Sequence, residues 1–348
     1  MTSFFERLAL HGPIIQAPMA GVQNHLLAAA VCEAGGLGSV PAAMLSPEDL
    51  RAQLQALQAT TPKAYNVNFF CHAPPSPDAA RQTAWHTALA PYYLDLGLDT
   101  NTIPNGPGRV PFNHAAADVL QDFRPAVVSF HFGLPAPDLL ARVRSWGSLI
   151  VSSATTVAEG LWLQAQGVDA LIAQGLEAGG HRGMFLREDL AGQTNTFDLL
   201  TAMVRAVQIP VIAAGGLADA ASVQHAKVLG ASGVQIGTAY LCSDEATTSN
   251  LHRSALQALE RQTALTNVFT GRPARGLINR VMRELGPMSP LAPAFPLATA
   301  ALTPLRTAAE AIGREDFSPL WAGDSRAPLP SGKAAEITRD FMAAWQEG

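Results

Sequence analysis

Eight short apolar segments, separated by stretches with helical character, constrain the fold of this chain most strongly. The apolar segments are residues 13–20, 36–40, 63–70, 126–133, 149–156, 170–175, 210–216 and 233–241. Each is almost continuously apolar, which is typical of parallel strands buried on both faces. The stretches that indicate helices between them are residues 25–34, 47–57, 137–145, 157–166, 196–207 and 220–229. Eight strands alternating with helices predict an α/β fold, a (β/α)8 TIM barrel rather than an open doubly wound sheet.

The chain has 348 residues, more than the roughly 250 that a barrel alone commonly needs. The strand–helix alternation stops after residue 241, and a helix is predicted in the long third connection, near residues 79–94. We therefore expect a barrel over 1–244, an inserted and mainly helical subdomain over 245–305, and C-terminal helices over 306–348 that pack back on the barrel.

Composition excludes several classes of protein. Hydrophobic residues make up 48% of the chain and charged residues 15%, which suits a large core and not a disordered chain. The net charge of −5 supplies no basic field, so we expect no nucleic-acid partner. Three widely spaced cysteines match neither a disulfide framework nor a zinc site. The N-terminus lacks a signal-peptide pattern and no segment has 18 uninterrupted apolar residues, so we expect a cytoplasmic protein without a membrane partner.

Glycines follow the last two predicted strands, as Gly215-Gly216 and Gly237-Thr238. In a TIM barrel the active site lies at the carboxyl ends of the strands, and phosphate commonly binds after strands seven and eight. Backbone N–H groups without a neighbouring Cβ can point at a phosphate, although ordinary tight turns also use glycine. The chain has no P-loop and no convincing G-x-G-x-x-G after a strand, which disfavours ATP and Rossmann-type dinucleotides. A mononucleotide such as FMN fits better.

Two histidines are candidates for catalysis. His181 lies among Gly179, Gly180 and Gly183, where a flexible backbone can aim an imidazole into a cavity for proton transfer. The alternative is a structural histidine in a loop that requires glycine. His131 lies between two phenylalanines on a predicted strand, so it is either a packed core residue or a second catalytic group.

Two amides and one carboxylate lie near these histidines in the sequence. Asn68 and Gln174 end predicted strands, where their amides can bond the isoalloxazine edge of a flavin or form ordinary turn hydrogen bonds. Glu177 lies four residues before His181, and the two side chains could pair. No third ligand with metal spacing follows, so we expect no metal site.

Together these segments resemble the nitronate monooxygenases, formerly called 2-nitropropane dioxygenases, which are FMN-dependent TIM barrels. The matching segments are residues 16–21 (QAPMAG), 66–72, 128–133 (VSFHFG), 173–183, 213–216, 235–241, 270–276 and 320–323 (LWAG). The glycine pair at 215–216 also occurs in other FMN barrels. The run EAGGHRG at 177–183 combined with SFHFG at 129–133 is specific, and the resemblance extends over essentially the whole chain.

The resemblance implies that FMN is the cofactor and that residues at the strand ends hold it. These residues are Pro18, Met19, Asn68, Gln174, Gly179, Gly180, Gly215, Gly216, Gly237 and Thr238. It implies oxidation of an alkyl nitronate, or a nitroalkane, by O2 to a carbonyl compound and nitrite through a flavosemiquinone. His181 is then the catalytic histidine: a base toward a neutral nitroalkane or, when protonated, a partner of the nitronate anion. We expect a monomer or a homodimer.

One departure from the family concerns polar residues of the substrate region. Where the best-described members have tyrosines and a lysine, this chain has Phe295, Thr299 and Thr303, so His131 or Arg272 would have to position an anionic substrate.

Two other functions stay open at this point. One is NAD(P)H-dependent reduction of quinones or enoyl thioesters through FMN, and the other is non-catalytic binding of FMN or a phosphate ligand.

Overall fold

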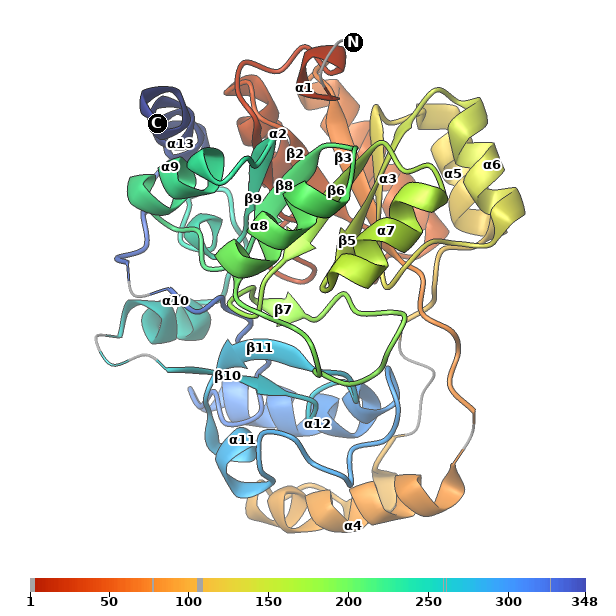
Figure 1. The fold of residues 1–348 in the computed structure, drawn as a ribbon. Coiled ribbons are helices and arrows are strands. Elements are labelled where there is room, and N and C mark those ends of the chain that lie inside the picture. Colours follow the sequence, from red (N-terminus) through yellow and green to blue (C-terminus); the bar gives the residue numbers. More distant parts are fainter. Residues whose placement is uncertain (1–3, 77, 105–108, 259, 261, 326) are drawn as a thin grey trace.

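The structure is a computed structural model that describes residues 4–348 except 77, 105–108, 259, 261 and 326. Eight parallel strands form the barrel: β1 (Ile14–Gln16), β2 (Gly38–Pro41), β3 (Tyr65–Phe70), β4 (Val127–His131), β5 (Leu149–Ala154), β6 (Ala170–Gln174), β8 (Val211–Ala214) and β9 (Gly233–Ile236). Their order is β1-β9-β8-β6-β5-β4-β3-β2, and the Leu37 N–H donates to the Ile14 carbonyl at 2.9 Å, which brings β2 against β1. The predicted TIM barrel is confirmed, and each predicted apolar segment contains one strand (Figure 1).

Helices surround the barrel. They are α2 (His25–Glu33), α3 (Pro47–Thr60), α5 (His114–Phe123), α6 (Pro137–Ser145), α7 (Val157–Ala165), α8 (Thr196–Ala206), α9 (Ala220–Val228) and α13 (Ala334–Glu347). The last helix packs against α9 and α2, and Lys227 Nζ donates to the Trp345 carbonyl at 2.8 Å. Among the described residues, no helix combines the length and the apolar character needed to cross a membrane.

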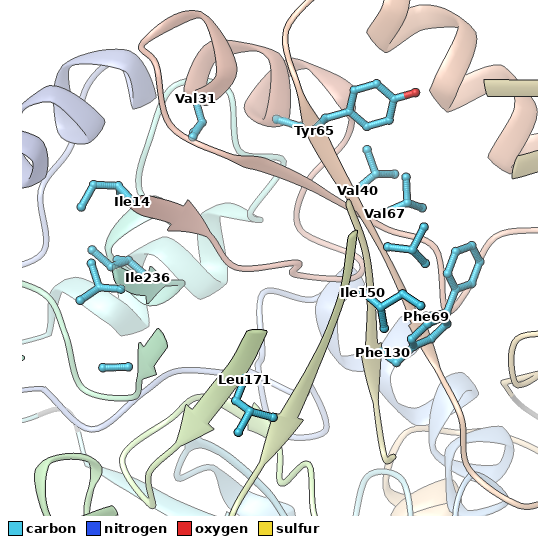
Figure 2. Packing of buried hydrophobic residues seen from close by; sticks show 14 of the residues in the cluster. Ile14, Val31, Val40, Tyr65, Val67, Phe69, Phe130, Ile150, Leu171 and Ile236 are labelled. Atoms are coloured by element: carbon cyan, nitrogen blue, oxygen red, sulfur yellow. The ribbon is translucent and has the colours of Figure 1, made fainter. Parts of the chain in front are cut away.

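Two hydrophobic layers hold the barrel, because alternate residues of a strand point to opposite faces. Ile14 and Ile150 belong to the layer between the strands and the helices, part of which Figure 2 shows. Their neighbours Ile15 and Val151 belong to a second cluster, which also includes both phenylalanines of the short N-terminal helix α1 (Phe4–Arg7). Burial on both faces explains why the strands are almost continuously apolar.

A second unit covers the carboxyl ends of the strands (Figure 1). It contains α4 (Ala79–Asp95), α10 (Asn250–Gln257), α11 (Arg280–Glu284), α12 (Ala298–Ala311), β10 (Thr263–Thr266) and β11 (Ala274–Leu277), while two 3-10 turns, η1 (Thr100–Thr102) and η2 (Thr238–Tyr240), lie in connections. α4 packs on α12, with Trp85 Nε1 donating to the Ala298 carbonyl at 3.4 Å. The expected boundary at residue 305 falls inside α12. The division at 244 and 305 remains a prediction.

The glycine-rich segment that carries His181 is paired with this second unit. Gly180 and His181 form a short strand, β7 (Gly180–His181), antiparallel to β11, with His181 opposite Ala274 and Gly180 opposite Arg275. The sequence predicts a loop here, since two residues that include a glycine carry no strand pattern. The segment after β6 therefore links the barrel sheet to the three-stranded sheet of β10, β11 and β7.

Candidate functional site

A cavity of about 260 Å³, here called the strand-end cavity, lies where the carboxyl ends of the barrel strands face the second unit. All of the predicted cofactor-binding and catalytic residues line it: Pro18, Met19, Asn68, His131, Gln174, Gly179, Gly180, His181, Gly215, Gly216, Gly237 and Thr238. They come from six different strand ends, so the barrel topology brings them together. The roles assigned to these residues from the sequence remain predictions.

One wall of the cavity consists of closely packed backbone. A Cβ at Gly179 would lie 2.6 Å from the Gly323 nitrogen, and a Cβ at Gly216 would lie 3.0 Å from the Asp324 carbonyl oxygen. Gly216 also has a φ of +67°, which favours glycine. The Gly323 N–H donates to Thr238 Oγ1 at 2.8 Å, which ties the WAG segment to the end of β9. Only glycine lets these segments approach so closely.

His181 presents one ring nitrogen to the cavity. Its Nε2 lies 3.0 Å from Thr270 Oγ1, which in turn lies 3.4 Å from the Arg272 carbonyl oxygen. We assign the Nε2–H tautomer, in which the threonine hydroxyl accepts from His181 and turns its own hydrogen toward the Arg272 carbonyl oxygen. Among the described residues, His181 Nδ1 has no protein partner. This tautomer leaves the Nδ1 lone pair free to take a proton.

Aromatic rings surround the His181 imidazole. The centroids of Phe70, Phe295 and Trp321 lie 5.8, 5.3 and 5.5 Å from that of His181. Burial in this setting, together with the positive charge of Arg109, lowers the pKa of His181 well below its ordinary value. The ring is therefore neutral near pH 7.

His131 and Gln174 hold the segment that carries His181. His131 Nε2 donates to the His181 carbonyl at 3.0 Å, while Nδ1 lies 2.6 Å from Ser153 Oγ. Gln174 donates from Nε2 to the same carbonyl at 2.9 Å, and its Oε1 accepts the Gly183 N–H at 2.7 Å. Burial lowers the pKa of His131 to about 3, so its ring is neutral. The polar atoms of both side chains are thus already paired with protein groups.

Arg182 anchors the segment that carries His181. Its side chain is fully buried and donates to the carbonyls of Gly175 and Gln174, at 2.5 and 2.7 Å, and to Gln193 Oε1 at 3.0 Å. Burial lowers its pKa to about 10, and the group remains charged at neutral pH. The sequence contains Arg182 within the EAGGHRG run but gives no sign of this anchoring role.

Two carboxylates stabilise the backbone around the segment without facing the His181 ring. Glu159 is buried and accepts from the N–H groups of Thr155 and Phe185 at 2.7 and 2.6 Å. Glu177, considered above as a partner of His181, accepts instead from the Thr196 N–H and hydroxyl, both at 2.8 Å, at the start of α8. Glu177 therefore caps a helix.

Two arginines near His181 have no ion-pair partner among the described residues. The Arg272 guanidinium lies 4.1 Å from the Phe132 ring centroid and donates to the Met184 carbonyl. The Arg109 guanidinium lies 5.8 Å from the Phe295 centroid, and its buried Nη1 has no partner. Burial lowers the pKa of both groups, that of Arg272 to about 10. Sequence reasoning missed Arg109, since it lies in a Pro/Gly-rich connection without a motif.

The three positions that depart from the family lie differently around the site. Phe295 packs against the His181 ring, as described above. Thr299 donates its hydroxyl to the Phe269 carbonyl at 3.1 Å, and Thr303 is exposed on α12, where it bonds the Thr299 carbonyl. None of the three hydroxyl or ring groups offers a free hydrogen-bond donor to the cavity.

Asn68 keeps one amide atom available at the cavity. Its Nδ2 donates to Ser129 Oγ at 2.9 Å, and its side-chain oxygen stays available at the cavity. On the opposite side, the Met19 N–H donates to Gln23 Oε1 at 2.8 Å and fixes the turn after β1. Pro18 and Met19 thereby form a fixed apolar wall.

Known proteins similar to this chain place it in one family. A family model described as nitronate monooxygenase matches residues 3–337. The nitronate monooxygenase of Paraburkholderia phytofirmans is 39% identical over 338 residues, which cover 95% of this chain and 91% of the relative. That of Pseudomonas aeruginosa is 39% identical over 346 residues, which cover 98% and 99%. A crystal structure of nitroalkane oxidase from Streptomyces ansochromogenes superposes with a TM-score of 0.89 at 36% identity, covering 99% of this chain and 98% of that one. On this similarity along nearly its whole length, the chain belongs to the nitronate monooxygenase family.

Proposed function

We propose that this protein is an FMN-dependent oxidoreductase that converts alkyl nitronates, and neutral nitroalkanes more slowly, to carbonyl compounds and nitrite with O2. One observation carries the proposal: a neutral His181 and Arg109, which has no ion-pair partner among the described residues, line the same cavity at the strand ends. Relatives named nitronate monooxygenase and nitroalkane oxidase support the same substrates. A cationic cavity wall without an opposing carboxylate suits an anionic substrate.

The residues present fit FMN. A Cβ at Gly180 would meet no atom within 4 Å, so the backbone there borders open space, and the close glycine contacts at 179 and 216 leave a narrow, polar backbone wall. We assign the phosphate to the N–H groups near Gly215, Gly216, Gly237 and Thr238. Pro18 and Met19 would lie against the flavin ring, with the Asn68 side-chain oxygen at its edge. When bound, FMN supplies the redox chemistry, and the protein orients and shields the reactants.

His181 moves the proton. With a neutral nitroalkane, the Nδ1 lone pair abstracts the α-proton, and Thr270 holds the ring by accepting from Nε2–H. The lowered pKa makes His181 a weak base, which is why we expect neutral substrates to react more slowly. A nitronate needs no such step. In the overall conversion two nitronates and one O2 give two carbonyl compounds and two nitrite ions: in each nitronate the carbon–nitrogen bond breaks, nitrite leaves, and the carbon gains one of the two oxygen atoms of O2.

The second unit excludes water from this chemistry. Phe295 and Trp321 pack against His181, together with Phe70 at the end of the barrel strand β3. Low local polarity strengthens the attraction between an anionic substrate and the arginines. We propose that Gln174 contributes through the His181 segment, since its amide is paired there.

An anaerobic absorbance titration of the purified protein tests the cofactor and the electron donor together. We expect a yellow protein whose visible flavin band changes on addition of propyl nitronate, and nitrite release when air is admitted. A parallel titration uses NADH. Bleaching by NADH with no response to propyl nitronate would overturn the proposal in favour of a reductase, and turnover of neither would favour a binding protein. A cytoplasmic location and a monomeric or homodimeric state stay predictions.

A further inference from the structure

Arg109 is a half-buried cation that has no individual role in the proposed proton transfer. It lines the strand-end cavity, and its Nη1 is buried without a hydrogen-bond partner. A buried unpartnered donor costs free energy unless a ligand or water satisfies it. Arg272 also has an unpartnered nitrogen, Nε, but it donates to the Met184 carbonyl, stacks on Phe132 and does not line the cavity. Of these two arginines, Arg109 is therefore the one whose unused donor belongs to a residue of the cavity wall.

Arg109 lies close to the His181 site. Phe295 separates the guanidinium from His181: its ring centroid lies 5.8 Å from the Arg109 Cζ and 5.3 Å from the His181 centroid. Arg109 is also the largest charged contributor to the lowered pKa of His181. Among the described residues, the side-chain contact of its other terminal nitrogen is with Met44 Sδ, a weak acceptor, at 3.9 Å.

The backbone at Arg109 is fixed independently of its side chain. His72 Nε2 donates to the Arg109 carbonyl at 3.2 Å, and His72 is itself buried against the Phe295 ring, with centroids 4.8 Å apart. Replacing the guanidinium therefore leaves this anchor in place. The position of the charge is set by the fold, and its polar atoms are left for a ligand.

We propose that Arg109 is a substrate-binding residue that holds the nitro-group oxygens of the nitronate and selects the anion over the neutral nitroalkane. This proposal rests on the proposed function. The nitronate carries its negative charge largely on the two nitro oxygens, which match the paired N–H donors of a guanidinium. Phe295 supplies no donor at this wall and Thr303 is exposed, so the charge for this task comes from Arg109.

The test compares Arg109→Met and Arg109→Lys with the wild-type flavin-containing protein. With propyl nitronate, we expect Arg109→Met to raise KM about tenfold to hundredfold, the loss of one charge-assisted contact. The KM for neutral nitropropane should change less than about threefold, since no full charge is lost there. Arg109→Lys should restore part of the affinity for the nitronate. A calorimetric titration with nitrate, an unreactive oxyanion of similar shape, should show the same weakening in Arg109→Met.

Arg142→Met is the matched control, because Arg142 is paired with Asp118 on the barrel surface at 2.8 Å. It should retain wild-type KM values. Equal KM changes for the anionic and neutral substrates, or unchanged nitrate affinity in Arg109→Met at wild-type flavin content and melting temperature, would refute the role of Arg109. A wild-type protein that does not oxidise nitronates would instead refute the proposed function, so the two failures are distinguishable.

Discussion

The interior position of His131 makes the stability of the protein sensitive to acid. In the native state its Nε2 donates to the His181 carbonyl, and burial lowers its pKa from 6.5 to about 3. The unfolded chain therefore binds more protons than the native protein between these values. By linkage, stability contributed by this group is present above about pH 6.5 and is lost as the pH falls below it.

The size of this effect follows from the same shift. One pKa unit corresponds to about 1.4 kcal/mol. Lowering the pH from about 7.5 to about 5 crosses about 1.5 units below the unfolded pKa, so a histidine that stays neutral in the native state lowers the free energy of unfolding by about 2 kcal/mol. His131 borders the cavity and is only partly shielded from it, so we expect about 1 to 2 kcal/mol. His131→Gln keeps a donor for the His181 carbonyl and cannot titrate. The variant should lose that much less stability over this pH interval than the wild type.

Urea unfolding at both pH values, followed by tryptophan fluorescence at matched flavin content, measures the difference. His114→Gln provides the control, since its side chain is 68% exposed on α5, and it should show wild-type acid sensitivity. Equal acid sensitivity of His131→Gln and the wild type would refute the assignment of a buried neutral His131. A lower flavin content in the variant would be corrected by repeating the measurement with added FMN.

Three further substitutions test the site. Gly216→Asp should yield colourless protein, because a carboxylate there repels the FMN phosphate and its Cβ would lie 3.0 Å from the Asp324 carbonyl oxygen; a normal ratio of flavin to protein would contradict the phosphate assignment. His181→Asn should retain flavin and lose about 10²- to 10⁴-fold of the activity toward neutral nitroalkanes, measured as nitrite release; full activity would exclude His181 as the base. Glu159→Gln should cost about 2 kcal/mol, because its single side-chain oxygen cannot accept from both the Phe185 and the Thr155 N–H, and hydrogen exchange at one of these two amides should accelerate; unchanged protection of both would show that the contacts are dispensable.

The barrel and most of the cavity wall could be predicted from the sequence because both follow from local patterns. Strands buried on both faces give continuous apolar runs, and a parallel barrel brings their carboxyl ends to one side. Gly216 and His181 could thus be placed in one site although they lie on different loops. In the structure both residues line the strand-end cavity.

Contacts between distant segments could not be predicted in this way. Arg109 and Phe295 lie in two connections far apart in the sequence, and no spacing in the chain indicates that they meet. The pairing of Gln174 with the His181 carbonyl was also hidden, since a strand-end amide has several possible partners. The sequence indicated which residues line the cavity, but it did not indicate what each of their side chains contacts.

The pairing of β7 with β11 has a consequence for building chimeras with relatives. Because His181 pairs with Ala274 of β11, the position of the His181 backbone depends on β11. β11 lies within the segment that a designer would exchange to alter substrate preference. Swapping residues 245–305 as a block would therefore also replace the hydrogen-bonding partner of the histidine strand. A transplant that keeps residues 270–277 of the recipient and exchanges only the flanking helices would vary the pocket while preserving the proton-transfer geometry.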